Sequence, residues 1–178
     1  MQKASVASIT YDAFSRHEAG VPRILLVADI PQEIRDQYPY AVTTLLSYRA
    51  RDNGLPLAGE FDRISALEGK IIHALRQSGY LHAGHITGNG NSRVVFYGPE
   101  NGPALVEVKT GLLSKTKVEL AYRHDPNWEI FRHELEPTEF EFETCRSRPL
   151  MTKLKEVGDN HATVRTVDFA AKFASNEA

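Results

Sequence analysis

The stretch that decides the fold reads LHAGHITGNGNSRVVFY and spans residues 81–97. Apolar and β-branched residues are frequent at its two ends, 81–87 and 93–97, which predicts two strands. The five residues between them are glycine, asparagine and serine. Glycine and asparagine tolerate the positive φ angles of tight turns, so the sequence predicts a β-hairpin.

One helix and two further strands precede this hairpin. Residues 60–78 carry apolar side chains at steps of three and four, which predicts a helix that Gly79 ends. The apolar stripe of this helix consists of Phe61, Ile64, Leu67, Ile71 and Leu75. Residues 23–30 and 41–48 are short apolar runs that predict strands, and the turn formers at 52–56 predict a loop.

A second helix and another strand are predicted after the hairpin. Residues 105–112 place Leu105, Val108 and Leu112 on one helical face, and residues 117–122 alternate as a half-buried strand does. From residue 41 to residue 122 the order is strand, helix, strand, strand, helix, strand. This is the ferredoxin-like β-α-β-β-α-β order, which predicts an α+β fold with helices on one face of an antiparallel sheet.

The remaining residues extend this core. We expect a polar lead-in over 1–22, the core domain over 23–122, a C-terminal segment packed on it over 123–173, and a tail over 174–178. Asp125 is predicted to cap a short helix, with Pro126 at the first helical position. A third helix is expected at 148–157 and a last strand at 163–169.

Composition and charge exclude several classes of protein. Of the 178 residues, 42% are hydrophobic and 25% charged, and the formal net charge is -2. Binding nucleic acid through its phosphates needs a concentrated basic surface, so this balance argues against direct nucleic-acid binding. No apolar run approaches the roughly 20 residues that span a bilayer, and the N-terminus does not read as a secretory signal. The sequence therefore predicts a cytoplasmic protein.

The sequence shows no catalytic constellation, cofactor loop or metal site. The glycine-rich loop at 88–90 lacks the lysine and the serine or threonine of a phosphate loop. His82 and His85 are three apart in a predicted strand, so they are expected on opposite faces, where they cannot share a metal. His124 and His133 have no third ligand at a supporting spacing. We predict a protein that is not an enzyme and that carries no cofactor and no metal.

The C-terminal third holds the residues predicted to bind a partner. These are Asp125, Trp128, Phe131, Glu136, Asp159, Arg165 and Asp168. Trp128 and Phe131 share one helical face and form an aromatic anchor, and the acidic run that contains Glu136 presents a negative face. The alternative for the aromatics is packing of the short helix onto the sheet, and for Asp125 it is a helix cap. For Arg165 the alternative is a structural ion pair with Asp159 or Asp125.

Residues 38–97 resemble a bacterial domain family of unknown function. That family has a Pro-Tyr-led strand, a Gly-Leu-Pro loop, an amphipathic helix with a central glutamate, and a hairpin ending in Phe-Tyr. The matching positions are Pro39-Tyr40, Gly54-Leu55-Pro56, Leu67-Glu68 and Phe96-Tyr97. The resemblance implies no activity.

Residues 120–173 resemble the C-terminal part of the RraB family, the regulators of ribonuclease E activity. The positions that carry the resemblance are Asp125-Pro126-Asn127-Trp128, Phe131, Leu135, Pro137, Gly158-Asp159 and Arg165-Thr166-Val167-Asp168. Members of that family are non-enzymatic and bind the ribonuclease. The resemblance implies a regulatory protein with a protein partner.

Three hypotheses about function follow. The first is a non-catalytic interaction or regulatory protein that modulates an RNA-processing enzyme. The second is a small-ligand-binding protein or an enzyme whose cleft uses His82, His85 or His124. The third is RNA binding on an open sheet face through stacking on Tyr97 and Tyr122.

Overall fold

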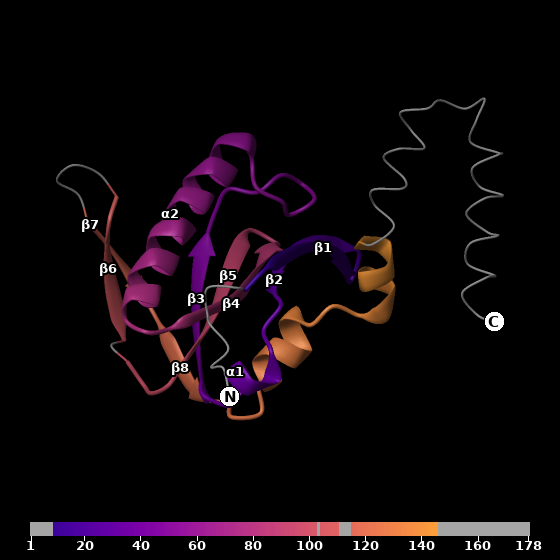
Figure 1. Ribbon diagram of the computed structural model, residues 1–178. Helices are drawn as coiled ribbons and strands as arrows, with labels where there is room; N and C mark the ends of the chain where they lie inside the picture. The colour runs from indigo at the N-terminus through magenta and orange to yellow at the C-terminus, as the bar shows by residue number, and fades with distance from the viewer. Residues whose placement is uncertain (1–8, 103, 111–114, 146–178) are drawn as a thin grey trace, which may run out of the picture. The chain divides into compact units, whose positions relative to one another are not determined.

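The computed structural model describes residues 9–102, 104–110 and 115–145 (Figure 1). The chain divides into two compact units, residues 1–137 and residues 138–178. In the second unit, residues 139–145 are helical. The predicted helix at 148–157 and strand at 163–169 lie outside the described residues, as do Asp159, Arg165 and Asp168.

A six-stranded antiparallel sheet in the order β1-β2-β4-β5-β3-β8 forms the centre of the first unit. Its strands are β1 (Tyr11–Glu18), β2 (Val21–Ala28), β3 (Tyr40–Ser47), β4 (Leu81–Gly88), β5 (Asn91–Gly98) and β8 (Ala121–His124). The predicted hairpin is the β4–β5 pair, and the strands predicted at 23–30 and 41–48 are β2 and β3. The predicted α+β class is confirmed, although β1 lies in the stretch interpreted as a polar lead-in.

The long helix α2 (Ala58–Gln77) packs across one face of this sheet, as Figure 1 shows. Its buried Ile64, Ile71 and Leu75 meet Val42 of β3 and Phe96 of β5 in one apolar core. These positions recur at the helical period, so the predicted stripe is the face that packs. A short helix, α1 (Gln32–Arg35), joins β2 to β3. Within the described residues, no helix is both long and apolar enough to cross a bilayer.

The helix predicted at 105–112 is wrong over its first five residues, which form strand β6 (Leu105–Lys109). This strand pairs with β7 (Lys115–Glu119) in a separate two-stranded hairpin that flanks α2. Val108 is buried while its neighbours are exposed, so the burial follows the period of a strand. The predicted strand at 117–122 divides between β7 and β8 at Leu120, whose N–H donates to the Ala104 carbonyl oxygen at 2.8 Å.

A short helical segment covers part of the opposite face of the sheet. Residues 129 and 130 begin it and the π-helical turn η2 (Phe131–Leu135) ends it. Asp125 caps the segment as predicted, because its carboxylate accepts the N–H groups of Glu129 and Ile130 at 2.8 and 3.0 Å. The prediction for Pro126 is wrong, since it lies in a turn and Trp128 then adopts a φ of 57° before the helix starts.

Candidate functional site

Three of the predicted partner-binding residues are buried in one place, the aspartate cluster, which we define as Tyr97, Asp125, Trp128 and Phe131. The Tyr97 hydroxyl donates to Asp125 Oδ2 at 2.8 Å and accepts the Phe131 N–H at 3.1 Å. The Trp128 ring stacks on Tyr97 with centroids 3.7 Å apart. Its Nε1 donates to the carbonyl oxygens of Arg35 and Tyr38.

The aspartate cluster favours the packing alternative over a surface anchor. Trp128 and Asp125 are each only 2% exposed, whereas the fourth described member of the predicted set, Glu136, is exposed. Burial alone would raise the pKa of Asp125, but the hydrogen bonds from Ile130, Glu129 and Tyr97 outweigh it and lower that pKa. Tyr97 lies beneath Trp128 and is not available to stack on an RNA base.

A second buried set, the histidine cluster, consists of Glu68, His82, His85, Thr87 and Ser92 beneath α2. The prediction that His82 and His85 lie on opposite faces is wrong, because their ring centroids are 6.2 Å apart. A β-bulge between His82 and Gly84 inserts one extra residue, so both histidines face α2. This bulge is the physical reason for the error.

The bulge depends on Gly84, whose φ is 150°. A Cβ atom there would lie 2.2 Å from the Leu26 carbonyl oxygen of β2 and 3.3 Å from the methyl carbons of Leu135. The missing side chain therefore lets β2 pair closely with β4 on one side and lets η2 pack on the other.

Polar contacts hold most of the histidine cluster together. Ser92 donates to the carboxylate of Glu68 and lies 3.1 Å from the Thr87 hydroxyl. His85 Nδ1 is 3.6 Å from Glu68 Oε2, which is too long for a hydrogen bond. Within the described part of the chain, His82 Nε2 and His85 Nδ1 have no hydrogen-bond partner.

The histidine cluster does not form an accessible catalytic cleft. His82 is 2% exposed, and its ring lies between Tyr11 and Phe96. Burial lowers the pKa of His82 to about 3, with a further contribution from His85, so the ring is neutral near pH 7. His124 lies elsewhere, against Tyr40 on the outer strand pair. Among residues 9–102, 104–110 and 115–145, no three His, Cys, Asp or Glu side chains are placed to hold a metal ion.

The exposed candidate site is an interrupted edge of the sheet at β3. β3 pairs with β5 along its whole length, but β8 covers its other side only from Tyr40 to Thr43. In an antiparallel strand, successive residues direct their backbone N–H and C=O groups to alternate sides. The Tyr48 N–H donates to the Gly90 carbonyl oxygen on the β5 side, so the even-numbered residues of β3 direct their backbone groups to β5. The Pro39 carbonyl oxygen accepts the Asp125 N–H on the β8 side, so the odd-numbered residues direct theirs to β8.

Leu45 is the odd-numbered residue just beyond the end of β8, so its N–H and C=O face the open edge. Within the described residues, neither group has a partner strand, because the pairing on this side ends at Thr43. The next odd residue, Ser47, has its carbonyl oxygen bonded by Arg63 Nη2 at 3.0 Å. The open backbone is therefore short and centred on Leu45.

A groove of about 620 Å³ runs along this edge. We call it the edge groove and define it by residues 43–47 of β3, residues 116–121 from β7 into β8, Arg63 and Leu67 of α2, and Arg93 of β5. A second hollow of about 340 Å³ on the sheet face away from α2 shares Leu45 and Arg93 with it. Leu45 is 60% exposed where the two meet, so an apolar side chain and open backbone lie together.

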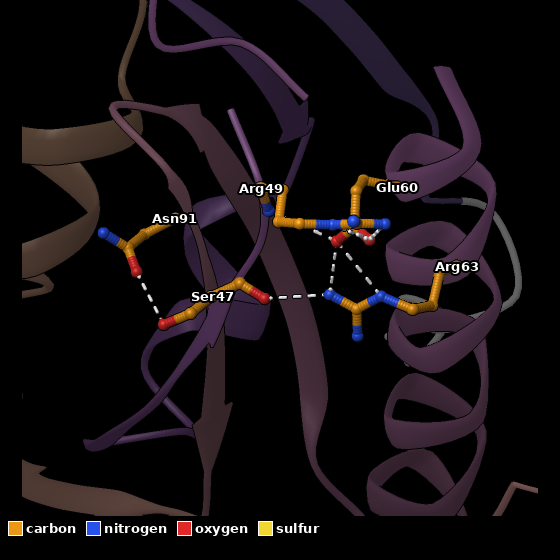
Figure 2. A network of polar contacts seen from close by, with 5 residues as sticks. All are labelled: Ser47, Arg49, Glu60, Arg63 and Asn91. Carbon is orange, nitrogen blue, oxygen red and sulfur yellow. Dashed lines mark hydrogen bonds and ion pairs between the residues drawn. The ribbon is translucent and has the colours of Figure 1, made fainter. Parts of the chain in front are cut away.

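A buried carboxylate fixes the arginine at the end of the edge groove. Glu60 in the first turn of α2 accepts from Arg63 Nη2 at 2.8 Å and from Arg49 Nη2 at 3.3 Å (Figure 2). The hydrogen bond from Arg63 is the main reason that the pKa of Glu60 lies below its ordinary value. Ser47 Oγ donates to Asn91 Oδ1 at 2.9 Å, which ties the end of β3 to β5.

The charges that the edge groove presents to solvent are mainly positive. Its lining holds Arg63, Arg93 and Lys117 and one acid, Glu119, and Arg93 is also paired with Glu134, which lies outside the lining, at 3.1 Å. The Arg63 side chain is 51% exposed whereas that of Glu60 is 10% exposed, so the guanidinium group covers its carboxylate partner. No pattern in the sequence predicts this groove, because the length of β8 depends on where β7 ends and β8 begins.

Comparison with known proteins identifies a family but no activity. The model of a family of unknown function, DUF695, matches residues 26–135, which is more than half of the chain. The match contains residues 38–97, for which a family of unknown function was predicted, and extends through the Asp125–Leu135 segment. No RraB-like segment is identified by this match. No curated protein and no solved structure matches the chain.

Proposed function

The chain belongs to DUF695, a family of unknown function, and we propose that it is a cytoplasmic, non-catalytic protein that binds another protein at the edge groove. The observation that carries the proposal is Leu45, a leucine 60% exposed beside an open strand edge. Covering such a side chain stabilises a complex by about 1–2 kcal/mol. Single exposed leucines are common on protein surfaces, so it is the open strand edge beside Leu45 that makes this surface a candidate for protein binding.

The buried clusters support the non-catalytic part of the proposal. A catalytic acid or base must reach its substrate, but Asp125 and His82 are each only 2% exposed. A small-ligand site built on His82, His85 and His124 has no support from their positions, since His124 lies apart from the other two. The edge groove itself holds arginine, lysine, threonine and leucine side chains, with Glu119 as its acid.

The RraB resemblance implies that the partner is an RNA-processing enzyme. In its specific form, our proposal is that this chain regulates such an enzyme by binding it. We propose further that β3, β4, β5 and β8 derive from a ferredoxin-like unit. Their order in the sheet, β4-β5-β3-β8, is the observation that supports it. The β6–β7 hairpin then stands where the second helix of such a unit lies.

Site-specific photocrosslinking tests the binding surface. A photoreactive amino acid at position 45 is compared with the same group at position 105, because Leu105 is an exposed leucine outside the edge groove. We expect position 45 to crosslink one discrete protein in a lysate of the source cells and position 105 not to do so.

The crosslinked protein is then purified, and an RNA-processing enzyme is tested beside it. Leu45→Asp is expected to weaken binding of the purified partner, since it places a charge where apolar contact forms. Equal crosslinking from both positions, or unchanged affinity of Leu45→Asp, contradicts the proposal.

A further inference from the structure

We propose that the edge groove binds an extended, acidic polypeptide segment that adds to the sheet as a strand beside β3. This inference rests on the proposed function and adds the binding mode and the chemistry of the partner. An open strand edge offers main-chain hydrogen bonds to any extended chain, and neighbouring side chains select which chain is bound.

The backbone groups of Leu45 define where the added strand lies. Its N–H and C=O both face the open edge, because Tyr48 N–H and Pro39 C=O fix the alternation along β3. A residue opposite Leu45 exchanges two main-chain hydrogen bonds with it. The added strand would lie beside β3 next to the first residue of β8, Ala121, which pairs with Thr43.

Side chains of an added strand alternate between the two faces of the sheet. The residue opposite Leu45 shares its face, where the exposed leucine favours an apolar side chain. The residues before and after it point to the α2 face, where Arg63 lies over the end of β3. An alternation of apolar and acidic residues therefore matches the edge groove.

Charge favours an acidic partner over a second copy of this chain. On the α2 side, the groove lining carries Arg63 and Lys117 against Glu119, whereas Arg93 lies on the other face and is paired with Glu134 at 3.1 Å. Pairing two copies through this edge would bring the same cations together, which repel, whereas glutamate side chains complement them. Arg63 is already held by Glu60, so less side-chain freedom is lost on binding.

Fluorescence anisotropy with the full chain tests the chemistry of the partner. The probe is a labelled eight-residue peptide that alternates glutamate and valine, and its counterpart alternates lysine and valine. We expect the acidic peptide to bind, the basic one not to bind, and added salt to weaken binding. Lys117→Gln is expected to lower the affinity for the acidic peptide. Lys115 lies outside the groove lining, so Lys115→Gln is expected to leave that affinity unchanged.

Proline at position 45 tests the main-chain part of the inference. Leu45→Pro removes the N–H that faces the open edge and leaves the pairing with β5 intact, and edge strands tolerate proline there. We expect affinity for the acidic peptide to fall about tenfold, the worth of one lost hydrogen bond with its partner left unpaired. Leu45→Val keeps the N–H and is expected to bind within about twofold to threefold of the wild type.

A modified peptide gives the same test without any change in the protein. N-methylation of alternate residues removes the peptide donors on one side of the strand, and only one of the two methylation patterns is expected to abolish binding. Equal binding by both patterns, or by Leu45→Pro, overturns strand addition but leaves a protein-binding surface at Leu45 in place. Preference for the basic peptide, for a single-stranded RNA of the same length, or for a dimer of the chain through this edge also overturns the inference.

Discussion

The two faces of the sheet each bury a polar cluster, and the clusters differ in how completely their atoms are paired. On one face, the Asp125 carboxylate accepts two backbone N–H groups and the Tyr97 hydroxyl. On the α2 face, the Ser92 hydroxyl satisfies Glu68, but His82 Nε2 and His85 Nδ1 have no hydrogen-bond partner in the described part of the chain. The same sheet thus carries one satisfied and one incompletely satisfied polar network.

The difference teaches which cluster stabilises the fold. A satisfied buried carboxylate fixes local structure, here the cap of residues 129–135 beneath Trp128. An unpaired buried ring nitrogen costs free energy and stays neutral, as the low pKa of His82 indicates. We therefore expect the aspartate cluster to contribute stability and His82 to add mainly a dependence on pH.

Gly84→Ala should disrupt both clusters and lower the free energy of unfolding more than any other substitution proposed below. The new Cβ would lie 2.2 Å from the Leu26 carbonyl oxygen, which is backbone and cannot swing away. Overpacking together with an unfavourable φ of 150° should lower the free energy of unfolding by about 3 kcal/mol or more. Urea unfolding followed by circular dichroism measures this.

Gly69→Ala is the matched control, since nothing lies within 4 Å of a Cβ atom there. Alanine in the middle of α2 should raise the free energy of unfolding by about 0.5–1 kcal/mol. If Gly84→Ala were as stable as the wild type, the close packing of Leu26 in β2 and Leu135 in η2 against Gly84 would be refuted.

Asp125→Asn should have the next largest effect, because it removes the charge that three donors share. Hydrogen bonds to a charged group contribute more than neutral ones, so we expect a loss of about 2–3 kcal/mol near pH 7. The pKa of Asp125 is lowered in the folded state, so this stability is present above its ordinary pKa and is lost as pH falls.

The exposed pair of Glu129 and Arg123, 2.7 Å apart, supplies the control for Asp125. Glu129→Gln should change the free energy of unfolding by less than about 1 kcal/mol, as expected for a surface ion pair. Equal losses from Asp125→Asn and Glu129→Gln would show that burial adds nothing at Asp125.

Periodicity predicted the elements whose sequence pattern agrees with their packing. The stripe of α2 and the apolar runs of β2, β3, β4 and β5 are buried where the pattern places them. The Asp125 cap was predicted for the same reason, since the motif and its hydrogen bonds are local. The bounds of these elements differ from the predicted ones by a few residues.

The errors arose where distant contacts override a local pattern. Leu105 and Val108 fit a helical face, but pairing with β7 makes the segment a strand. The bulge before Gly84 cannot be read from the sequence, because it depends on how β4 meets β5, and it decides where His82 and His85 point. The edge groove was missed for a similar reason, since the end of β8 is set by β7.

Ser92→Ala probes the satisfied part of the histidine cluster and should have a moderate effect. It leaves Glu68 and the Thr87 hydroxyl without the donor or acceptor that Ser92 supplies. We expect the free energy of unfolding at pH 7 to fall by about 1–2 kcal/mol. Ser78→Ala, at the exposed end of α2, should change it by less than about 0.5 kcal/mol, and equal effects would refute the network.

His82→Phe should have the smallest effect near pH 7 and a visible one in acid. The pKa of His82 is lowered to about 3 in the folded protein, against an ordinary value of 6.5, so the unfolded chain binds the extra proton between these values. Stability of the wild type should therefore fall as pH drops below 6.5, by about 2 kcal/mol at pH 5.

Phenylalanine fills similar space, has no unpaired nitrogen and does not titrate, so His82→Phe should match the wild type within about 1 kcal/mol at pH 7 and exceed it at pH 5. Urea unfolding at both pH values measures the crossover. His73→Gln on the exposed side of α2 is the control and should follow the wild type at both pH values. Parallel curves for His82→Phe and the wild type would mean that the second cluster is as well satisfied as the first, and the contrast between the two faces would disappear.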